Sequence, residues 1–399
     1  MRWVDGGVTA ASGFLAAGVS AGIKRSRKPD LALVTAHRPV AAAGVFTANR
    51  VKAAPVVISH RRLRRGRAMA VLINSGCANC MTGARGYQDA LTLGREVARA
   101  LGVSEQEVLL ASTGLIGRGL PVAKIRRAIP RLVSRLSRNH HHEAAQALLT
   151  TDRAPKEVAV DGIIRGSRFR LGGMAKGAGM IHPSMATMLG VLTTDVAIAP
   201  SVLRAMLRQA VGATFNRISV DGDMSTNDTI FALASGMSGV TIAPGTRSQR
   251  LFGEMLKAVC ERLAWLIVRD GEGASKLMEV QVVGARTERE AQAAARQVAN
   301  SPLVKTMLAG SDPNVGRIAA AVGASSAHFN PNRLEIRLGD GVVVSRGVAL
   351  HVGSAALRSM LNHREVKVTI NLRAGDAQAR MLACDLTEAY VRLNAGYAT

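Results

Sequence analysis

The apolar positions of residues 1–150 fall into short β-type runs and into segments with helical spacing. Runs of Val, Leu, Ile and Ala between polar or glycine-containing turns are typical of strands. They predict strands over residues 31–35, 42–47, 55–59, 68–73 and 108–112. Apolar residues that repeat at intervals of three and four indicate amphipathic helices. These predict helices over residues 89–101, 124–136 and 143–149.

The rest of the chain has the same mixture of patterns. Strands are predicted over residues 188–193, 277–283, 334–338, 342–349 and 366–371. Helices are predicted over residues 200–213, 225–234, 248–268 and 287–298. Pro200 suits the first turn of its helix, and Thr287 is a candidate N-cap. Because strands and helices do not alternate cleanly as βαβ units, the pattern predicts a layered α+β fold.

The composition is that of a globular chain with a large core. The 399 residues, 48% of them hydrophobic, suffice for one large or two ordinary domains. No apolar run reaches the roughly 20 residues of a membrane span, so we expect no membrane partner. Cys77 and Cys80 have the spacing of half a zinc site, but Cys260 and Cys384 stand alone. We therefore expect no metal, and free thiols in a reducing cytoplasm.

The positive charge of the chain is large and uneven. There are 52 basic and 28 acidic residues, a net charge of +24. Residues 1–186 hold 29 basic and 10 acidic residues, or +19, and the remainder hold 23 and 18, or +5. Basic clusters occur at residues 24–28, 60–67 and 126–138 without interleaved aromatic residues that could stack on bases. We expect a solvated basic surface and no nucleic-acid partner; steering of an anionic substrate or cofactor is the alternative.

A glycine-rich run over residues 176–189 begins at Lys176 and ends in Ala186-Thr187-Met188-Leu189. A threonine hydroxyl is a weak nucleophile unless a base lies beside it. Cleavage between Ala186 and Thr187 would free an α-amino group with a pKa of roughly 7.7 to 8.0, which can take the hydroxyl proton. An ordinary strand threonine is the alternative for Thr187. The ammonium of Lys176 can hold an anionic substrate group or lower the pKa of the amine.

Two further glycine-flanked segments carry candidate chemistry. Residues 111–117 contain Thr113 and Gly114, and a turn there would direct backbone N–H groups toward a developing oxyanion. Residues 268–276 place Glu272 between two glycines, where its carboxylate can meet a substrate ammonium or a proton-transfer step. Each segment, taken singly, also fits an ordinary turn.

Residues 216–229 form a third polar segment, with three aspartates. They resemble part of a calcium-binding loop but lack the glutamate that closes one. Helix capping by Asp223 or Ser225 is the favoured interpretation of this segment.

Ten motifs in order carry a resemblance that spans nearly the whole chain. They lie at residues 44–50, 74–79, 112–114, 150–152, 176–189, 220–223, 270–273, 312–317, 384–387 and 394–399. Together they resemble the arginine-biosynthesis glutamate N-acetyltransferases, also called ornithine acetyltransferases. The resemblance implies a layered αββα sandwich, a fold shared with a group of self-cleaving aminopeptidases.

The resemblance also implies a reaction. A precursor is cut between Ala186 and Thr187 into fragments 1–186 and 187–399, which stay associated as a heterotetramer. Thr187 accepts the acetyl group of N-acetylornithine and passes it to glutamate, and Thr113 and Gly114 form the oxyanion hole. The implied substrate-binding residues are Thr150, Lys176, Thr187, Glu272, Asn394 and Thr399.

Five residues depart from those common in this family: Cys77, Arg118, Arg153, Ser184 and Val315. They bear on substrate preference and rate more than on reaction class. The resemblance implies no resident cofactor and leaves open whether acetyl-CoA is a second acetyl donor. A self-processing amidohydrolase or aminopeptidase, in which water resolves the acyl-enzyme, is the first alternative. A basic binding protein without catalysis is the second.

Overall fold

The computed structural model describes residues 1–182 and 188–396. Its largest sheet has nine strands in the order β1-β6-β7-β8-β11-β3-β4-β5, and β2 pairs with β3. The strands are β1 (Arg2–Val4), β2 (Phe14–Val19), β3 (Leu31–Phe46), β4 (Arg67–Cys77), β5 (Val108–Leu115), β6 (Lys156–Ile164), β7 (Ser167–Lys176), β8 (Leu189–Thr194) and β11 (Thr229–Ala234).

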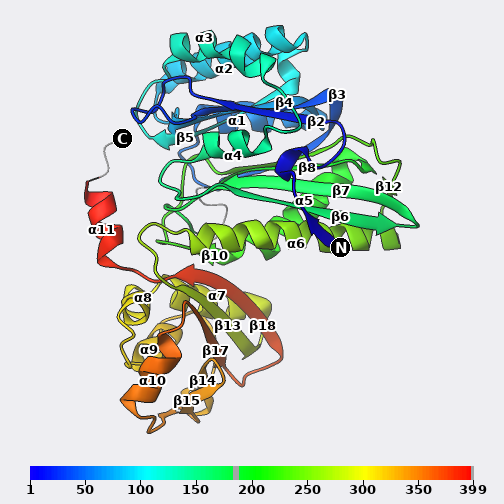
Figure 1. Cartoon of the computed structure of the whole chain (residues 1–399). Coiled ribbons are helices and arrows are strands. Elements are labelled where there is room, and N and C mark those ends of the chain that lie inside the picture. Colours follow the sequence, from blue (N-terminus) through cyan, green and yellow to red (C-terminus); the bar gives the residue numbers. More distant parts are fainter. Residues whose placement is uncertain (183–187, 397–399) are drawn as a thin grey trace.

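This sheet folds into two layers because the long strand β3 belongs to both of them (Figure 1). Residues 31–36 of β3 pair with β2, whereas residues 41–46 pair with β11. The ladder between β3 and β4 shifts register between Thr35 and Val40, around Pro39, which has no N–H to donate. Apolar side chains from both layers then meet in a shared core: Phe14, Val34, Ile73, Leu109, Val191 and Phe231.

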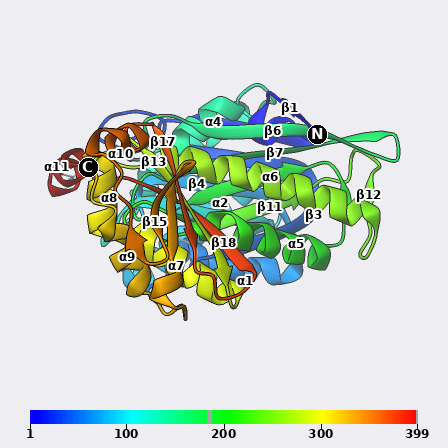
Figure 2. The same ribbon diagram turned by 90° about the horizontal axis from the view of Figure 1, so that it is seen from below.

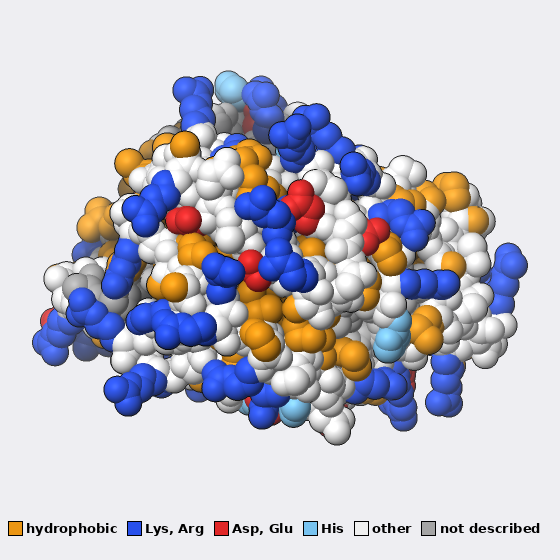
Figure 3. Space-filling model, turned by 90° about the horizontal axis from the view of Figure 1, so that it is seen from above, with side chains coloured by type: hydrophobic (Ala, Val, Ile, Leu, Met, Phe, Trp, Pro, Cys, Tyr) orange, Lys and Arg blue, Asp and Glu red, His pale blue; other side chains and the backbone are white. Residues whose placement is uncertain are grey.

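Helices cover both outer faces of the sandwich (Figures 1 and 2). On the side of β4 and β5 lie α1 (Ala54–Arg62), α2 (Gly83–Leu101) and α3 (Val122–Ser134). Seen from above, the surface carries many Lys and Arg side chains and few Asp or Glu side chains (Figure 3). On the side of β6, β7, β8 and β11 lie α5 (Pro200–Ala213) and α6 (Arg247–Arg269). A further helix, α4 (His141–Leu148), packs on β2 and β3. The α+β class and the αββα layering are therefore confirmed.

The C-terminal part of the chain adds a second sheet with its own core, at the bottom of Figure 1. Its seven strands follow the order β10-β18-β13-β17-β14-β15-β16. They are β10 (Ile218–Ser219), β13 (Leu277–Ala285), β14 (Glu335–Leu338), β15 (Gly341–Ser345), β16 (Val348–Ala349), β17 (Glu365–Asn371) and β18 (Ala377–Cys384). The accompanying helices are α7 (Glu288–Asn300), α8 (Pro302–Ala309), α9 (Gly316–Gly323), α10 (Ser354–Leu361) and α11 (Glu388–Ala395). Within the described ranges no helix is long and apolar enough to span a membrane.

The predicted strand at residues 55–59 is wrong, because these residues lie in helix α1. The β-branched Val56, Val57 and Ile58 suggested a strand, but Pro55 occupies the first turn of the helix, where proline is favoured. The buried Ser59 also bonds to the backbone of β5, with its Oγ 2.7 Å from the carbonyl oxygen of Leu110. Packing on β5 thus overrides the local β propensity.

The predicted helix at residues 225–234 is also wrong, because residues 229–234 form strand β11. This strand lies between β8 and β3 and is buried at every position. A strand buried on both faces shows no alternation of polar and apolar residues, so its pattern resembles that of a buried helix. Consequently Asp223 and Ser225 have no helix to cap at this place.

Candidate active site

The ends of three strands bring the predicted site residues together. Thr113 and Gly114 lie near the end of β5, and Lys176 is the last residue of β7. Lys176 pairs in register with Leu189, the first residue of β8. Ala186 and Thr187, the predicted cleavage site, and Thr399 lie outside the described residues. Leu189, two positions after Thr187 in the sequence, lies opposite Lys176 in this ladder.

Gly114 sits where only glycine fits. Its φ of 127° lies in a region that side chains disfavour. A Cβ at this position would lie 2.6 Å from the backbone nitrogen of Cys77 and 2.7 Å from Cα of Gly76. The ladder between β4 and β5 is irregular at the same place, so the expected turn is a bulge within a continuing strand. Bulges of this kind redirect backbone groups next to active sites.

Lys176 places a buried ammonium group next to Thr113. Its side chain is 3% exposed, and its Nζ lies 3.4 Å from the hydroxyl oxygen of Thr113. Burial lowers the pKa of this lysine, and the neighbouring Asp152 opposes that shift. The contact links the strand that carries Gly114 to the strand that precedes residue 187.

Asp152 balances two buried lysines and was noted in the sequence only as part of the 150–152 motif. Its fully buried carboxylate lies 2.7 Å from Nζ of Lys156 and 3.9 Å from Nζ of Lys176. It also accepts the backbone N–H of Gly177 at 2.7 Å and that of Thr150 at 3.2 Å. Burial by itself would raise its pKa, but the two ammonium groups hold the pKa of Asp152 well below its usual value.

Glu272 approaches the same glycine-rich loop from the other side. Its backbone N–H donates to the carbonyl oxygen of Ala178 at 2.8 Å. A Cβ on Gly179 would lie 2.5 Å from Oε1 of Glu272, so the missing side chain leaves room for the carboxylate. Asn394 of α11 donates from Nδ2 to Oε2 of Glu272 at 2.9 Å. The predicted pair Glu272 and Asn394 therefore lies together, beside Ala178 and Gly179.

Two aspartates of the polar segment 216–229 support this loop, and the sequence interpretation missed both roles. Asp221 accepts the backbone N–H groups of Met180 and Ile181 at 2.6 and 2.9 Å. Asp228 is fully buried and accepts the backbone N–H of Met188, next to Thr187, at 2.9 Å. Among the described residues, Oδ2 of Asp228 has no hydrogen-bond partner. Burial raises the pKa of Asp228 well above its usual value.

A cavity of about 680 Å³ opens beside this cluster. Thr150, Asp152 and Gly76 line it, as do basic residues of the loop between β2 and β3. The cavity is large enough for a substrate and its leaving group. Across the parts of the chain that are described, no group of three His, Cys, Asp or Glu residues is placed to hold a metal ion.

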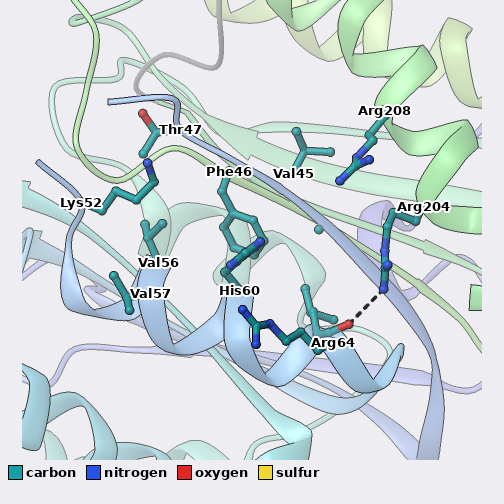
Figure 4. A pocket seen from close by; sticks show the side chains of 12 residues that line it. Val45, Phe46, Thr47, Lys52, Val56, Val57, His60, Arg64, Arg204 and Arg208 are labelled. Atoms are coloured by element: carbon teal, nitrogen blue, oxygen red, sulfur yellow. Dashed lines mark hydrogen bonds between the residues drawn. The ribbon is translucent and has the colours of Figure 1, made fainter. Parts of the chain in front are cut away.

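A second cavity, of about 430 Å³, lies between α1, β3 and α5 (Figure 4). Its lining includes five basic side chains: Lys52, His60, Arg64, Arg204 and Arg208. Arg204 donates to the backbone carbonyl of Leu63 at 3.2 Å. None of the site residues predicted from the sequence lines this cavity.

The fold and the clustered site define an enzyme of the acyl-transfer class. The profile of the ArgJ family matches residues 15–399 of the chain. An arginine biosynthesis bifunctional protein ArgJ from Symbiobacterium thermophilum is 46% identical over 402 residues, covering 100% of both chains. The one from Nitratidesulfovibrio vulgaris is 48% identical over 387 residues, covering 96% of this chain and 98% of the relative.

Among solved structures, a chain of the arginine biosynthesis bifunctional protein ArgJ from Bacillus halodurans is similar with a TM-score of 0.50 and 40% identity. The match covers 51% of this chain and 97% of that one. The present chain belongs to the ArgJ family. This membership confirms the expectation of an arginine-biosynthesis acetyltransferase.

Proposed function

We propose that the enzyme transfers the acetyl group of N-acetylornithine to glutamate through an acetyl ester on Thr187. The products are ornithine and N-acetylglutamate. The observation that carries the proposal is the contact of the buried Lys176 ammonium with Thr113, beside the glycine-built bulge at Gly114. This contact brings Thr113, Gly114 and Lys176 together at the end of β7, the strand that precedes residue 187 in the sequence. A charged group and hydrogen-bond donors at one point are what an acyl-transfer site requires.

The reactive threonine is made by self-cleavage between Ala186 and Thr187. The new α-amino group takes the hydroxyl proton as the oxygen attacks the acetyl carbon. Asp228 supports this role, since it holds the N–H of Met188, one residue from the amine. Burial raises the pKa of Asp228, so its carboxyl group stays neutral over a wider pH range and is a weak counter-ion for that amine.

Fragments 1–186 and 187–399 remain associated after the cut. Strands β7 and β8 flank the cleavage site and pair over six positions, from Leu171 with Thr194 to Lys176 with Leu189. Both strands are buried in the central sheet, so separating them would expose apolar surface and unpaired backbone groups. The solved Bacillus halodurans chain matches 51% of this chain, about the share of one such fragment. We further propose that two pairs of fragments form the heterotetramer.

Thr113 and Gly114 stabilise the oxyanion of the tetrahedral intermediate. The Gly114 N–H and the Thr113 hydroxyl act as donors, and the Lys176 ammonium holds the hydroxyl by donating to its oxygen. A positive charge beside these donors strengthens their interaction with a developing negative charge, because the site is buried. One such donor is worth roughly 2.7 to 4 kcal/mol of transition-state stabilisation.

The remaining predicted residues bind the substrates. The half-buried Glu272 carboxylate suits the ammonium group of ornithine, and Asn394 orients it through their hydrogen bond. Thr150 lies on the cavity wall next to Asp152, and Thr399 completes the set from the C-terminus. A substrate carboxylate is drawn toward Lys176. No resident cofactor or metal is required, and acetyl-CoA serves as a second acetyl donor.

The four cysteines Cys77, Cys80, Cys260 and Cys384 are buried free thiols. Thiols of this kind suit a reducing compartment, and we therefore place the enzyme in the cytoplasm.

A product assay separates the transferase from a hydrolase of the same fold. The purified protein is incubated with N-acetylornithine and glutamate, and both amino-acid products and acetate are quantified. We expect ornithine and N-acetylglutamate in equal amounts. Acetate in place of N-acetylglutamate would show that water resolves the acyl-enzyme, as in the aminopeptidase alternative. A control without glutamate gives the rate of hydrolysis alone.

A further inference from the structure

The basic cluster at residues 24–28 lies on a loop with a fixed shape. This loop joins β2 to β3 and wraps around the fully buried carboxylate of Asp30. Asp30 accepts the backbone N–H groups of Ala21, Ile23 and Lys24 at 2.6, 2.6 and 3.0 Å. A buried carboxylate with three backbone donors holds the loop in one conformation. The basic side chains therefore project from a preorganised support.

This loop forms one wall of the 680 Å³ cavity. Lys24, Arg25 and Lys28 line the cavity, as does Arg153 from the opposite wall. Of the lining residues that the structure describes, one is acidic, Asp152, and its charge is already balanced by Lys156 and Lys176. Arg153 likewise forms an ion pair, with its Nε 3.8 Å from Oδ1 of Asp270.

Of the three cations of the loop, Lys24 donates from Nζ to the backbone carbonyl oxygen of Pro29 at 2.8 Å. Considering the described residues, Lys24, Arg25 and Lys28 take part in no ion pair. Burial lowers the pKa of Lys24 to about 8, against the opposing effects of Asp30 and Asp152. Holding these three cations close together on one cavity wall costs free energy through mutual repulsion. Asp30 and Asp152 offset part of this cost at Lys24, and an anionic ligand would relieve the rest.

The cavity adjoins the proposed oxyanion hole. A Cβ on Gly76 would lie 3.1 Å from Cγ of Lys24, so the lysine stem passes directly over this glycine. Gly76 in turn lies against Gly114, because a Cβ on Gly114 would overlap backbone atoms of Gly76. A ligand on the loop can therefore extend its other end toward the site of acetyl transfer.

We propose that Lys24, Arg25 and Lys28 bind the phosphate groups of acetyl-CoA when it acts as the acetyl donor. The inference rests on the proposed function and adds the location of this donor. N-acetylornithine carries one positive and one negative group and glutamate a net charge of −1 at neutral pH, so neither matches three cations. Phosphates carry several charges and accept the strong hydrogen bonds that Arg and Lys donate. The cavity is also larger than a single amino acid requires.

The reaction from this donor balances without another reagent. The Thr187 oxygen forms a bond to the acetyl carbon, and the bond from that carbon to sulfur breaks. The hydroxyl proton passes through the α-amino group to the leaving thiolate, which departs as the free thiol. Glutamate then takes the acetyl group, as it does after transfer from N-acetylornithine.

A charge-reversal pair tests the proposal against a matched control. The test variant is Arg25→Glu with Lys28→Glu, and the control is Arg64→Glu with Arg208→Glu at the second cavity (Figure 4). All four side chains are exposed, and both variants change the net charge equally. KM is measured for acetyl-CoA, for N-acetylornithine and for glutamate in each variant.

We expect the test variant to raise KM for acetyl-CoA at least about tenfold, since two charge-assisted contacts are lost. KM for N-acetylornithine and for glutamate should change by less than about twofold, and the control variant should leave all three values near those of the unmodified enzyme. An equal rise for N-acetylornithine or glutamate would assign the loop to carboxylates and overturn the proposal. An equal rise in the control would assign the effect to net charge and overturn it as well.

Two outcomes separate this proposal from the proposed function. Transfer from N-acetylornithine without any transfer from acetyl-CoA in the unmodified enzyme would overturn the donor site and leave the proposed function intact. Absence of transfer from N-acetylornithine would overturn the proposed function itself. An unchanged KM for acetyl-CoA in the test variant would exclude the loop as its phosphate site.

Discussion

The close approach of Gly114 to β4 makes a specific prediction for Gly114→Ala. The new Cβ would lie 2.6 Å from the nitrogen of Cys77 and 2.7 Å from Cα of Gly76, both backbone atoms. Ordinary contacts of a methyl group are longer by about 1 Å. Overpacking costs about 1–3 kcal/mol, and alanine at a φ of 127° adds about 1–3 kcal/mol of backbone strain. We expect the end of β5 to move away from β4 to relieve this cost.

Such a movement would displace the Gly114 N–H from its place in the oxyanion hole. Loss of one oxyanion donor lowers kcat by about 10²–10³, and we expect a fall of this size with KM little changed. The assay measures ornithine release at several concentrations of N-acetylornithine. Because self-cleavage requires its own oxyanion, the fraction of cut chain is measured by intact mass, and kcat is expressed per cut chain.

Gly117→Ala is the matched control. Gly117 has a φ of 79°, but a Cβ there would meet nothing within 4 Å. This variant carries the strain of a left-handed residue, about 1–2 kcal/mol, without the clash. It should keep the kcat of the unmodified enzyme. If Gly114→Ala retained kcat within about threefold of that of the control, the reasoning from the close approach would be refuted.

Three further predictions concern polar side chains that hold the fold together. Asp152→Asn should lower the free energy of unfolding by about 3–5 kcal/mol in urea titrations, because the buried Lys176 loses its ion-pair partner and Lys156 keeps only Asp270. The folded-state pKa of Asp152 is lowered, so its stabilising contribution is present above about pH 4 and lost on acidification; a variant with unchanged acid sensitivity would contradict this. Asp228→Asn should unfold at a higher temperature at pH 7, since a carboxyl group whose pKa is higher in the folded than in the unfolded chain loses stability as the pH rises above its unfolded pKa. The variant should nevertheless self-cleave more slowly, and faster cleavage on intact-mass time courses would disprove the supporting role of Asp228. Thr287→Ala should cost about 1 kcal/mol of unfolding free energy without affecting turnover, because the Thr287 side chain caps α7; an unchanged urea midpoint would argue against the cap.

Helices α2 to α7 could be predicted from the sequence, whereas α1 was taken for a strand and α8 to α11 were not predicted. Residues 200–213 were predicted as a helix with the bounds of α5, and Thr287 caps α7 through the N–H of Glu290. These segments combine an amphipathic face with a local start signal, and both signals act within a few residues. The strand β11 was missed because it is buried on both faces, which removes the alternation that identifies a strand.

Three residues of the candidate site could be found from local motifs in the sequence. Short-range reasoning singled out Lys176, Thr113 and Glu272, and the fold places Lys176 within 3.4 Å of Thr113. The role of Asp228 could not be predicted, because its hydrogen-bond partner Met188 lies 40 residues away in the sequence. The two residues come together only through the pairing of β8 with β11. The balancing charge of Asp152 likewise depends on lysines that only the folded sheet brings together.

The central claim is that Thr187 becomes the acetyl carrier after the chain cuts itself. An intact-mass spectrum of the purified protein, recorded before and after incubation with N-acetylornithine alone, tests it most directly. We predict two fragments, of 186 and 213 (399 − 186) residues, with the mass of one acetyl group added to the larger fragment after incubation. The same spectrum of Thr187→Ala should show the uncut chain without added mass. A single uncut chain in the unmodified protein, or cut fragments that never gain an acetyl group, would contradict the account.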